Sequence, residues 1–285
     1  MFKSFNSKWK IKVIQSGLFK LDGGAMMGSV PKVMWEKTNP SDEFNRINLS
    51  MRCLLLDNGN DVILIETGVG NKNNTKFIDM FCIQQTDFPL KDELKNHGYD
   101  LEDVTHVILT HLHFDHVGGA TYFNGSDIVP TFPNAKYIIS KSNWNAAVNP
   151  NPKDRASYLP QNFIPIQEAG QLELIDDNQQ IMEGIETLVV HGHTTGQQLI
   201  KVIVDSDTLV FCSDLIPLKS HVRIPWIMGY DLNSMQTIEE KTLFLDEASD
   251  KNWLLFFYHD PETIAVRVKK NEKYYAIIEE YTIND

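Results

Sequence analysis

The sequence predicts a layered α/β or α+β domain in which two packed β-sheets are covered by helices. Apolar runs rich in β-branched residues come in two clusters along the chain, and helical patterns lie between and after them. Each sheet must bury an apolar face, which such a layered arrangement provides. The chain has 285 residues, 42% of them hydrophobic, and no shift in composition marks a boundary. We therefore expect a single domain over residues 1–285 with a sizeable core.

Turn residues between apolar runs predict two hairpins. Asn58-Gly59-Asn60 separates the expected strands 49–57 and 61–66, and Asp205-Ser206-Asp207 separates a later pair. Residues 70–76 are polar and are expected to form a loop. The full set of expected strands covers residues 11–20, 49–57, 61–66, 104–110, 137–140, 172–175, 185–190, 199–204, 208–212 and 253–258.

Four segments show the periodicity of helices. They cover residues 89–97, the surroundings of Trp144, residues 234–248 and residues 272–281. Thr237 and Glu240 offer one capping box for the third segment. The last segment is expected to be an amphipathic helix that ends the fold.

The segment Leu21–Pro31 is glycine-rich and apolar at the same time. A flexible linker would be polar, and a phosphate loop would end in Gly-Lys-Ser/Thr before a helix. Two interpretations stay open. The segment is either an apolar flap over a pocket or an Ω-loop packed into the core.

Composition excludes several classes of protein. A formal net charge of -12 argues against a general nucleic-acid binder. Three cysteines without a CxxC pair argue against a disulfide framework and favour a reducing compartment. Residues 11–15 are too few and too polar for a secretory segment, and no apolar run has the length of a membrane span. We expect a cytoplasmic protein without a nucleic-acid or membrane partner.

The stretch Thr110–Gly119 gathers three histidines and one aspartate within six residues, directly after an apolar strand. His111 and His113 are two residues apart and face the same way on an extended segment. Asp115 and His116 follow where the chain must turn. Imidazole and carboxylate are zinc ligands, so the stretch predicts a metal site. The alternative is a solvated polar loop, but nine histidines in the chain make three in one such window rare by chance.

Three further polar clusters end apolar strands. They are His191-Gly192-His193, Ser213-Asp214 and His259-Asp260. A single histidine at the end of a buried strand is usually structural. Together with the histidine-rich stretch, however, the clusters form one set of metal-binding residue types.

These motifs resemble those of the metallo-β-lactamase superfamily in its two-metal hydrolase form. The resemblance spans residues 11–260 and implies the αββα four-layer sandwich of that superfamily. The motifs that carry it are Thr-His-Leu-His-Phe-Asp-His-Val-Gly-Gly at 110–119, Gly-His-Thr-Thr-Gly at 192–196, Ser-Asp at 213–214 and His-Asp at 259–260.

The resemblance implies two bound zinc ions, with iron, manganese or cobalt as alternatives. One ion would be held by His111, His113 and His193, the other by Asp115, His116 and His259, and Asp214 would bridge both. His191 lies outside the pattern and is expected to be structural or to support a ligand. Glu66 stands where many members place an aspartate before Thr-Gly, a position that is normally structural.

Leu21–Trp35 and Phe257–Glu262 resemble the quorum-quenching N-acyl-homoserine lactonases and their organophosphate-hydrolysing relatives. The implied activity is opening of a lactone ring by a hydroxide that bridges the metals, with Asp115 passing a proton to the leaving group. Phosphotriester or aryl-ester hydrolysis on the same site is the alternative. A non-catalytic metal-binding or sensor module and a redox iron site are further alternatives.

The resemblance does not identify which residue of this chain would orient the substrate. Pro217 occupies a position where lactonases often have a tyrosine. The candidates that could replace this tyrosine are Tyr230, Tyr258 and His221.

Two stretches rich in methionine and tryptophan are more apolar than surface loops should be. We expect them to line one hydrophobic pocket beside the metals, for the acyl or aryl group of a small-molecule substrate. The alternative is that Trp35 and Trp226 are ordinary core or dimer contacts, and the sequence leaves a homodimer open. The expected pocket residues are Met26, Met27, Trp35, His221, Ile224, Trp226, Met228 and Tyr230.

Overall fold

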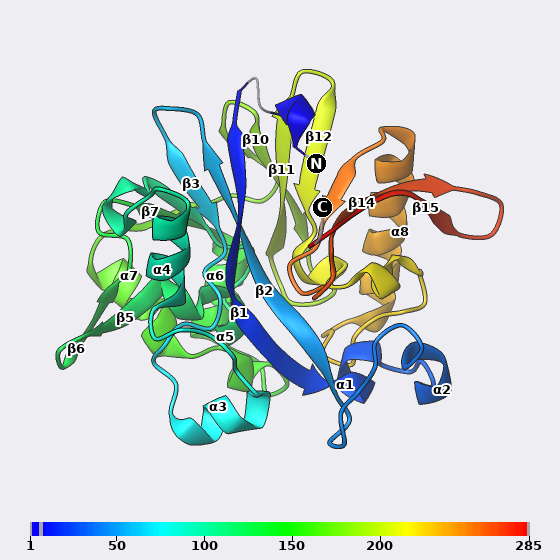
Figure 1. Ribbon diagram of the computed structural model, residues 1–285, viewed down its shortest axis with the longest axis horizontal. Helices are drawn as coiled ribbons and strands as arrows, with labels where there is room; N and C mark the ends of the chain where they lie inside the picture. Colours follow the sequence, from blue (N-terminus) through cyan, green and yellow to red (C-terminus); the bar gives the residue numbers. More distant parts are fainter. Residues whose placement is uncertain (1, 6–7, 284–285) are drawn as a thin grey trace. The chain divides into compact units, whose positions relative to one another are not determined.

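The computed structural model of the protein describes residues 2–5 and 8–283. It has the mixed α/β class that the sequence predicts, with two large sheets (Figure 1). The chain divides into two compact units. Unit 1 comprises Lys20–Ser50 and Asn178–Asp285, and unit 2 comprises Phe2–Phe19 and Met51–Asp177. No helix among the described residues has the length and apolarity needed to cross a membrane.

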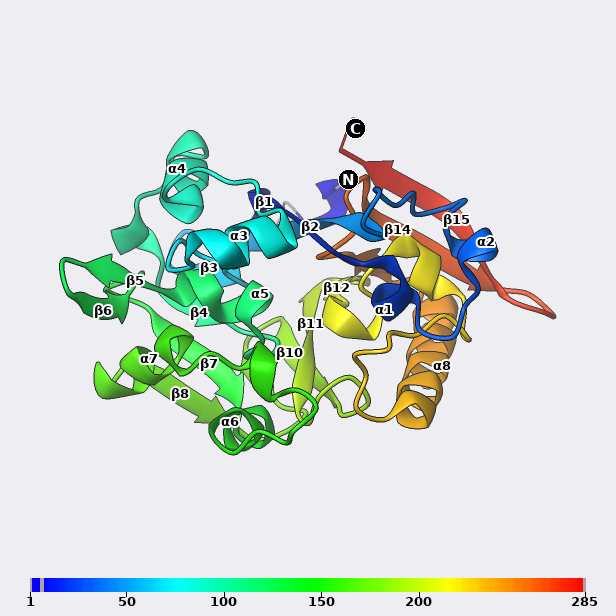
Figure 2. The ribbon, with the colours of Figure 1, turned by 90° about the horizontal axis from the view of Figure 1, so that it is seen from below.

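Unit 2 is built on a six-stranded sheet with the order β1-β2-β3-β4-β7-β8, and Figure 2 labels its strands. β2 and β3 are antiparallel, whereas β3, β4, β7 and β8 run parallel to one another. β1 and β2 continue from unit 2 into unit 1. The strands of this sheet are β1 (Lys10–Asp22), β2 (Arg46–Asp57), β3 (Val62–Ile65), β4 (His106–Ile108), β7 (Lys136–Ser140) and β8 (Leu172–Ile175).

The predicted hairpin between β2 and β3 is confirmed, and side chains of its turn hold it. Asp57 Oδ1 accepts from Gly59 N at 2.7 Å, and Asn58 Oδ1 accepts from Asp61 N at 2.7 Å. Gly59 has a φ of 91°, which favours glycine at this position.

Short helices and one small hairpin connect the strands of unit 2, and α6 packs beside β7 and β8 (Figure 2). The small hairpin consists of β5 (Thr121–Asn124) and β6 (Asp127–Pro130). The helices are α3 (Thr75–Phe81), α4 (Pro89–Asn96), α5 (Phe114–Val117), α6 (Lys141–Val148) and α7 (Ile164–Glu168), and the 3-10 helices are η1 (Lys3–Phe5), η2 (Leu101–Asp103), η3 (Gly118–Ala120), η4 (Arg155–Ser157) and η5 (Pro160–Asn162).

Unit 1 contains a seven-stranded sheet with the order β15-β14-β13-β12-β11-β10-β9. Only the β12–β13 pair is parallel among these neighbours. The strands are β9 (Gln180–Met182), β10 (Ile185–Val190), β11 (Gln197–Val204), β12 (Asp207–Phe211), β13 (Leu254–Phe256), β14 (Thr263–Lys270) and β15 (Tyr275–Thr282), and the helices are α1 (Gly23–Met27), α2 (Lys32–Trp35), η6 (Ser213–Leu215), η7 (Lys219–Val222) and α8 (Ser234–Asp250).

Helix α8 covers this sheet and lies along β14 (Figure 1). Its residues Phe244, Leu245 and Ala248 are buried in one core cluster with Leu255 of β13 and Val266 of β14. Burying one such side chain contributes about 1.5–3 kcal/mol, so this helix face is the main reason that α8 stays on the sheet.

Two sequence predictions in unit 1 are wrong. Residues 272–281 were expected to be a helix, but Tyr275–Thr282 form β15, which pairs antiparallel with β14. The cap of α8 is Asn233, whose side chain accepts from Gln236 N, and not a capping box of Thr237 and Glu240.

The glycine-rich segment forms the short helix α1 after β1 ends. Met26 and Met27 are 1% and 0% exposed, which agrees with the core-packed interpretation. Asp22 caps the helix by accepting from Ala25 N at 2.8 Å. In unit 2, α3 begins at Thr75, within the end of the expected loop 70–76.

Candidate metal centre

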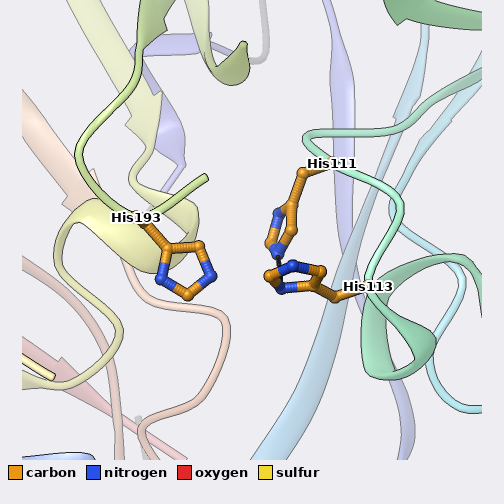
Figure 3. A group of neighbouring side chains, drawn as sticks. All are labelled: His111, His113 and His193. Atoms are coloured by element: carbon orange, nitrogen blue, oxygen red, sulfur yellow. Dashed lines mark hydrogen bonds between the residues drawn. The ribbon is translucent and has the colours of Figure 1, made fainter. Parts of the chain in front are cut away.

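Unit 2 carries four neighbouring side chains of metal-binding type between the end of β4 and the single turn of α5. His111 Nε2 lies 3.0 Å from His113 Nδ1 (Figure 3), and the ring centroids of His111 and His116 are 4.0 Å apart. Asp115 Oδ2 lies 4.0 Å from His116 Nε2. All four residues are buried. The local chain therefore brings together the three imidazoles and the carboxylate of this motif.

The imidazoles of His111 and His116 each have a side-chain oxygen close to Nδ1. His111 Nδ1 lies 3.0 Å from Thr110 Oγ1, and His116 Nδ1 lies 3.4 Å from Glu66 Oε2. Glu66 is fully buried, and its Oε1 accepts from Thr110 N at 2.7 Å. Its φ of 68° is a strained conformation for a residue other than glycine. Glu66, the departure from the usual family pattern, thus holds Thr110 by a hydrogen bond and places its second carboxylate oxygen beside His116.

The turn of α5 is anchored to the segment that follows β3. Thr67 donates to His116 O through both its N, at 2.9 Å, and its Oγ1, at 2.8 Å. A Cβ on Gly118 would lie 2.2 Å from Val69 O, and one on Gly119 would lie 2.1 Å from Thr67 O. The two glycines are required because the backbones approach so closely, and any side chain would push α5 away.

Unit 1 carries three further candidate metal ligands on loops that follow β10, β12 and β13, and we call these three and the four of unit 2 the candidate donors. Asp214 Oδ2 lies 3.3 Å from His193 Nε2, and Asp214 Oδ1 lies 3.3 Å from His259 Nε2. One carboxylate therefore faces an imidazole with each of its oxygens. Figure 3 also labels His193, which belongs to unit 1.

Both histidines of unit 1 are fixed in the tautomer that a metal ligand needs. His193 Nδ1 donates to Asp231 Oδ1 at 3.0 Å, and His259 Nδ1 donates to Ser50 O at 2.9 Å. Because carboxylate and carbonyl oxygens only accept from these rings, Nδ1 carries the proton and Nε2 keeps its lone pair. Metal-bound histidines typically have such a hydrogen bond on the second nitrogen.

The donor sets in both units fit zinc. Imidazole nitrogen and carboxylate oxygen are its usual non-thiolate ligands in hydrolase sites. Burial within the protein removes most competition from bulk water. The donors are His111, His113, Asp115 and His116 in unit 2, and His193, Asp214 and His259 in unit 1, each less than 8% exposed.

A family model described as the Metallo-beta-lactamase superfamily matches residues 51–259, which include all seven donors. The chain belongs to this superfamily. It is a metallo-hydrolase of that superfamily, and its mixed α/β fold is the one that the motifs implied.

Related proteins agree with this assignment. The chain is 27% identical to an N-acyl homoserine lactonase of Bacillus cereus over 234 residues, covering 76% of this chain and 84% of that one. A probable metal-dependent hydrolase from Staphylococcus aureus has a TM-score of 0.87 and 28% identity, covering 97% of this chain and 98% of that one. A dizinc quorum-quenching lactonase in complex with a product has a TM-score of 0.79 and 19% identity, covering 96% and 95%.

The two stretches expected to line a substrate pocket contact each other within unit 1. His221 Nε2 donates to Met26 O at 2.9 Å, and Gly229 N donates to Ala25 O at 2.7 Å. Most of these side chains are buried, whereas Ile224 is half-buried and Tyr230 is 39% exposed. The buried ones are Met26, Met27, Trp35, His221, Trp226 and Met228.

The segment that carries Trp226 is tied down by a buried lysine. Lys241 Nζ donates to Trp226 O at 2.5 Å and to Arg223 O at 3.3 Å. Burial lowers the pKa of Lys241 to about 7. The role of these residues in substrate binding remains a prediction, because their contacts fit a packed core as well as a pocket wall.

Sequence reasoning missed the residues that support the donors. Asp231 was not singled out, because no motif accompanies it. Glu240 accepts from His191 N at 2.8 Å and from Gly192 N at 2.9 Å, so it holds the loop before His193. A glutamate on a helix does not by itself indicate that its side chain will bind the backbone of a distant loop, so this role of Glu240 could not be predicted from the sequence.

The three candidates for the missing tyrosine have different surroundings. Tyr258 is buried, and its ring centroid lies 4.6 Å from that of His259. His221 is occupied by its hydrogen bond to Met26. Tyr230 is the most exposed of the three. The assignment of a substrate-orienting role stays a prediction.

Proposed function

We propose that the protein is a two-zinc lactonase that opens an N-acyl-homoserine lactone or a similar ring. The observation that carries the proposal is the set of seven buried donors in a chain 27% identical to an N-acyl homoserine lactonase. One zinc takes three or four protein ligands, so seven donors suit two ions. His111, His113 and His193 would hold one zinc, Asp115, His116 and His259 the other, and Asp214 would bridge them.

Bound zinc would supply Lewis acidity toward the lactone carbonyl and would lower the pKa of water to about 7. The protein's own part is to position donors and to move a proton. Asp231 and the carbonyl of Ser50 keep His193 and His259 in one tautomer, and Glu66 places a carboxylate oxygen 3.4 Å from Nδ1 of His116. Asp115 would carry a proton to the alkoxide oxygen that leaves when the ring opens.

A substrate panel on one zinc-replete preparation tests the activity. It should contain N-acyl-homoserine lactones of increasing chain length, phosphotriesters and aryl esters, with kcat/KM measured for each. We expect the lactones to be the best class. If phosphotriesters or aryl esters are turned over faster than every lactone, the lactonase proposal is wrong, although the protein is still a hydrolase.

Substitution of one donor tests the two-metal site. His116→Ala should bind one zinc in place of two and lower kcat/KM at least about a hundredfold, since each metal contributes several kcal/mol. The matched control is His97→Ala, a half-buried histidine after α4 that is not a donor. Full activity of a folded His116→Ala protein, or one zinc per chain in the wild type under excess zinc, would overturn the two-zinc proposal.

A further inference from the structure

Unit 1 contains a cavity of about 940 Å³ that none of the seven donors lines. Its walls come from four parts of the unit: residues 38–48, the segment around η7, the loop before β14 and the β14–β15 hairpin. Cavities of about 300–1,000 Å³ are the size of sites for small organic ligands. The cavity therefore has the dimensions of a second binding site, separate from the proposed metals.

One part of the wall is apolar. It is formed by Ile47, Val222, Ile224, Pro225 and Tyr274, of which Ile47 and Val222 are buried and Tyr274 is 61% exposed. Such a surface favours an alkyl or aryl group, because moving apolar groups out of water onto an apolar wall is favourable.

The same wall carries an arginine, Arg223, whose guanidinium is held in place by an aromatic ring. The Arg223 guanidinium lies over the Trp226 ring, 4.5 Å from its centroid. Within the part of the chain that the structure describes, no carboxylate forms an ion pair with it. Three lysines also line the cavity: Lys219 pairs with Glu280 at 2.6 Å, Lys270 pairs with Asp246 at 2.5 Å, and Lys273 is exposed on the β14–β15 hairpin. A stacked guanidinium keeps its in-plane N–H groups available for a carboxylate.

Ser220, three residues before Arg223 in the same segment, adds a second polar group. Its Oγ is buried and forms no hydrogen bond to the described residues. Buried hydroxyls nearly always have a partner, so an unsatisfied one in a cavity wall indicates a ligand or ordered water there. Ser220 and Arg223 both line the cavity.

We propose that this cavity binds a small amphipathic carboxylate. The alkyl part would lie on the apolar wall, and the carboxylate would accept from Arg223 and Ser220. The lining also contains acidic residues, which act against the binding of a negatively charged ligand. Asp260 accepts from the backbone N of Lys219 and Glu262, among others, and Glu280 pairs with Lys219. Glu262 and Glu272 are exposed.

Isothermal titration of the zinc-loaded protein with hexanoate, octanoate and decanoate tests the proposal. We expect one site whose affinity rises by up to about fourfold per methylene. Arg223→Gln should weaken octanoate binding at least about tenfold, because a charge-assisted hydrogen bond is lost. Ser220→Ala should weaken it by a smaller factor. Lys32→Gln is the matched control, since Lys32 also lies over an indole ring in unit 1 but does not line the cavity.

Two further measurements test where the carboxylate binds and which charge the cavity prefers. The first distinguishes binding in this cavity from binding at the proposed metals, and the second compares a carboxylate with a cation. Octanoate should bind His116→Ala as tightly as the wild type. Loss of binding in that variant together with full binding in Arg223→Gln would show that the carboxylate sits on zinc, and would overturn the proposal. Tighter binding of octyltrimethylammonium than of octanoate, or no binding of any carboxylate, would overturn it as well. None of these outcomes depends on whether the protein is a lactonase.

Discussion

We expect the buried histidine His221 to make the stability of the protein depend on pH below neutrality. His221 is 1% exposed, and its Nε2 donates to Met26 O at 2.9 Å. Burial lowers the pKa of His221 to about 4, and the charge of Lys241 acts in the same direction. The carboxylates of Asp231 and Asp214 act against this shift without reversing it.

The size of the effect follows from the two pKa values. In the unfolded chain a histidine takes up a proton near pH 6.5, whereas His221 in the folded chain does so only near pH 4. As the pH falls through this window, the unfolded state binds the proton first, so the free energy of unfolding decreases. Between about pH 7 and about pH 5 the loss due to His221 is about 2 kcal/mol.

The substitution His221→Gln isolates this contribution, because a glutamine amide can still donate to Met26 O but does not titrate. Urea unfolding, followed by circular dichroism at several pH values with zinc content checked at each, gives the free energy of unfolding of both proteins. The wild type should lose about 2 kcal/mol more than the variant between about pH 7 and about pH 5. Parallel pH dependences of the two proteins would refute the reasoning.

Three other predictions address the donors and the pocket. Asp231→Asn should weaken zinc affinity about 10- to 100-fold, measured by chelator competition, because His193 loses its carboxylate acceptor; an unchanged affinity would contradict this role. Glu66→Gln should lower zinc affinity less, since an amide oxygen can still accept from Thr110 N, and a loss as large as that of Asp231→Asn would show that the charge near His116 matters most. Trp226→Ala should raise KM for long-chain lactones more than for short ones, and equal effects would remove Trp226 from the predicted pocket.

Several elements could be predicted because their signals are local. The β2–β3 hairpin follows from Asn58-Gly59-Asn60, and the strand Ile185–Val190 has the bounds that its apolar run indicated. The seven donor types could be listed for the same reason, since each motif directly follows an apolar run.

Residues 272–281 show where local patterns fail. Their apolar and polar residues fit a helical period, yet the same stretch contains Tyr275, Ile277 and Ile278, which favour strands. Pairing with β14 decided the outcome, because a sheet edge supplies hydrogen bonds that a short sequence window cannot reveal.

The superfamily motifs, the types of the candidate donors and the mixed α/β class could all be recognised in local stretches of the chain. The groups that support the candidate donors became visible only in the folded protein. Asp231 lies 38 residues from His193 along the chain, and Ser50 lies 209 residues from His259. Such hydrogen bonds depend on where distant segments meet after folding, and a local pattern of residues does not show which distant segments will lie close together in space.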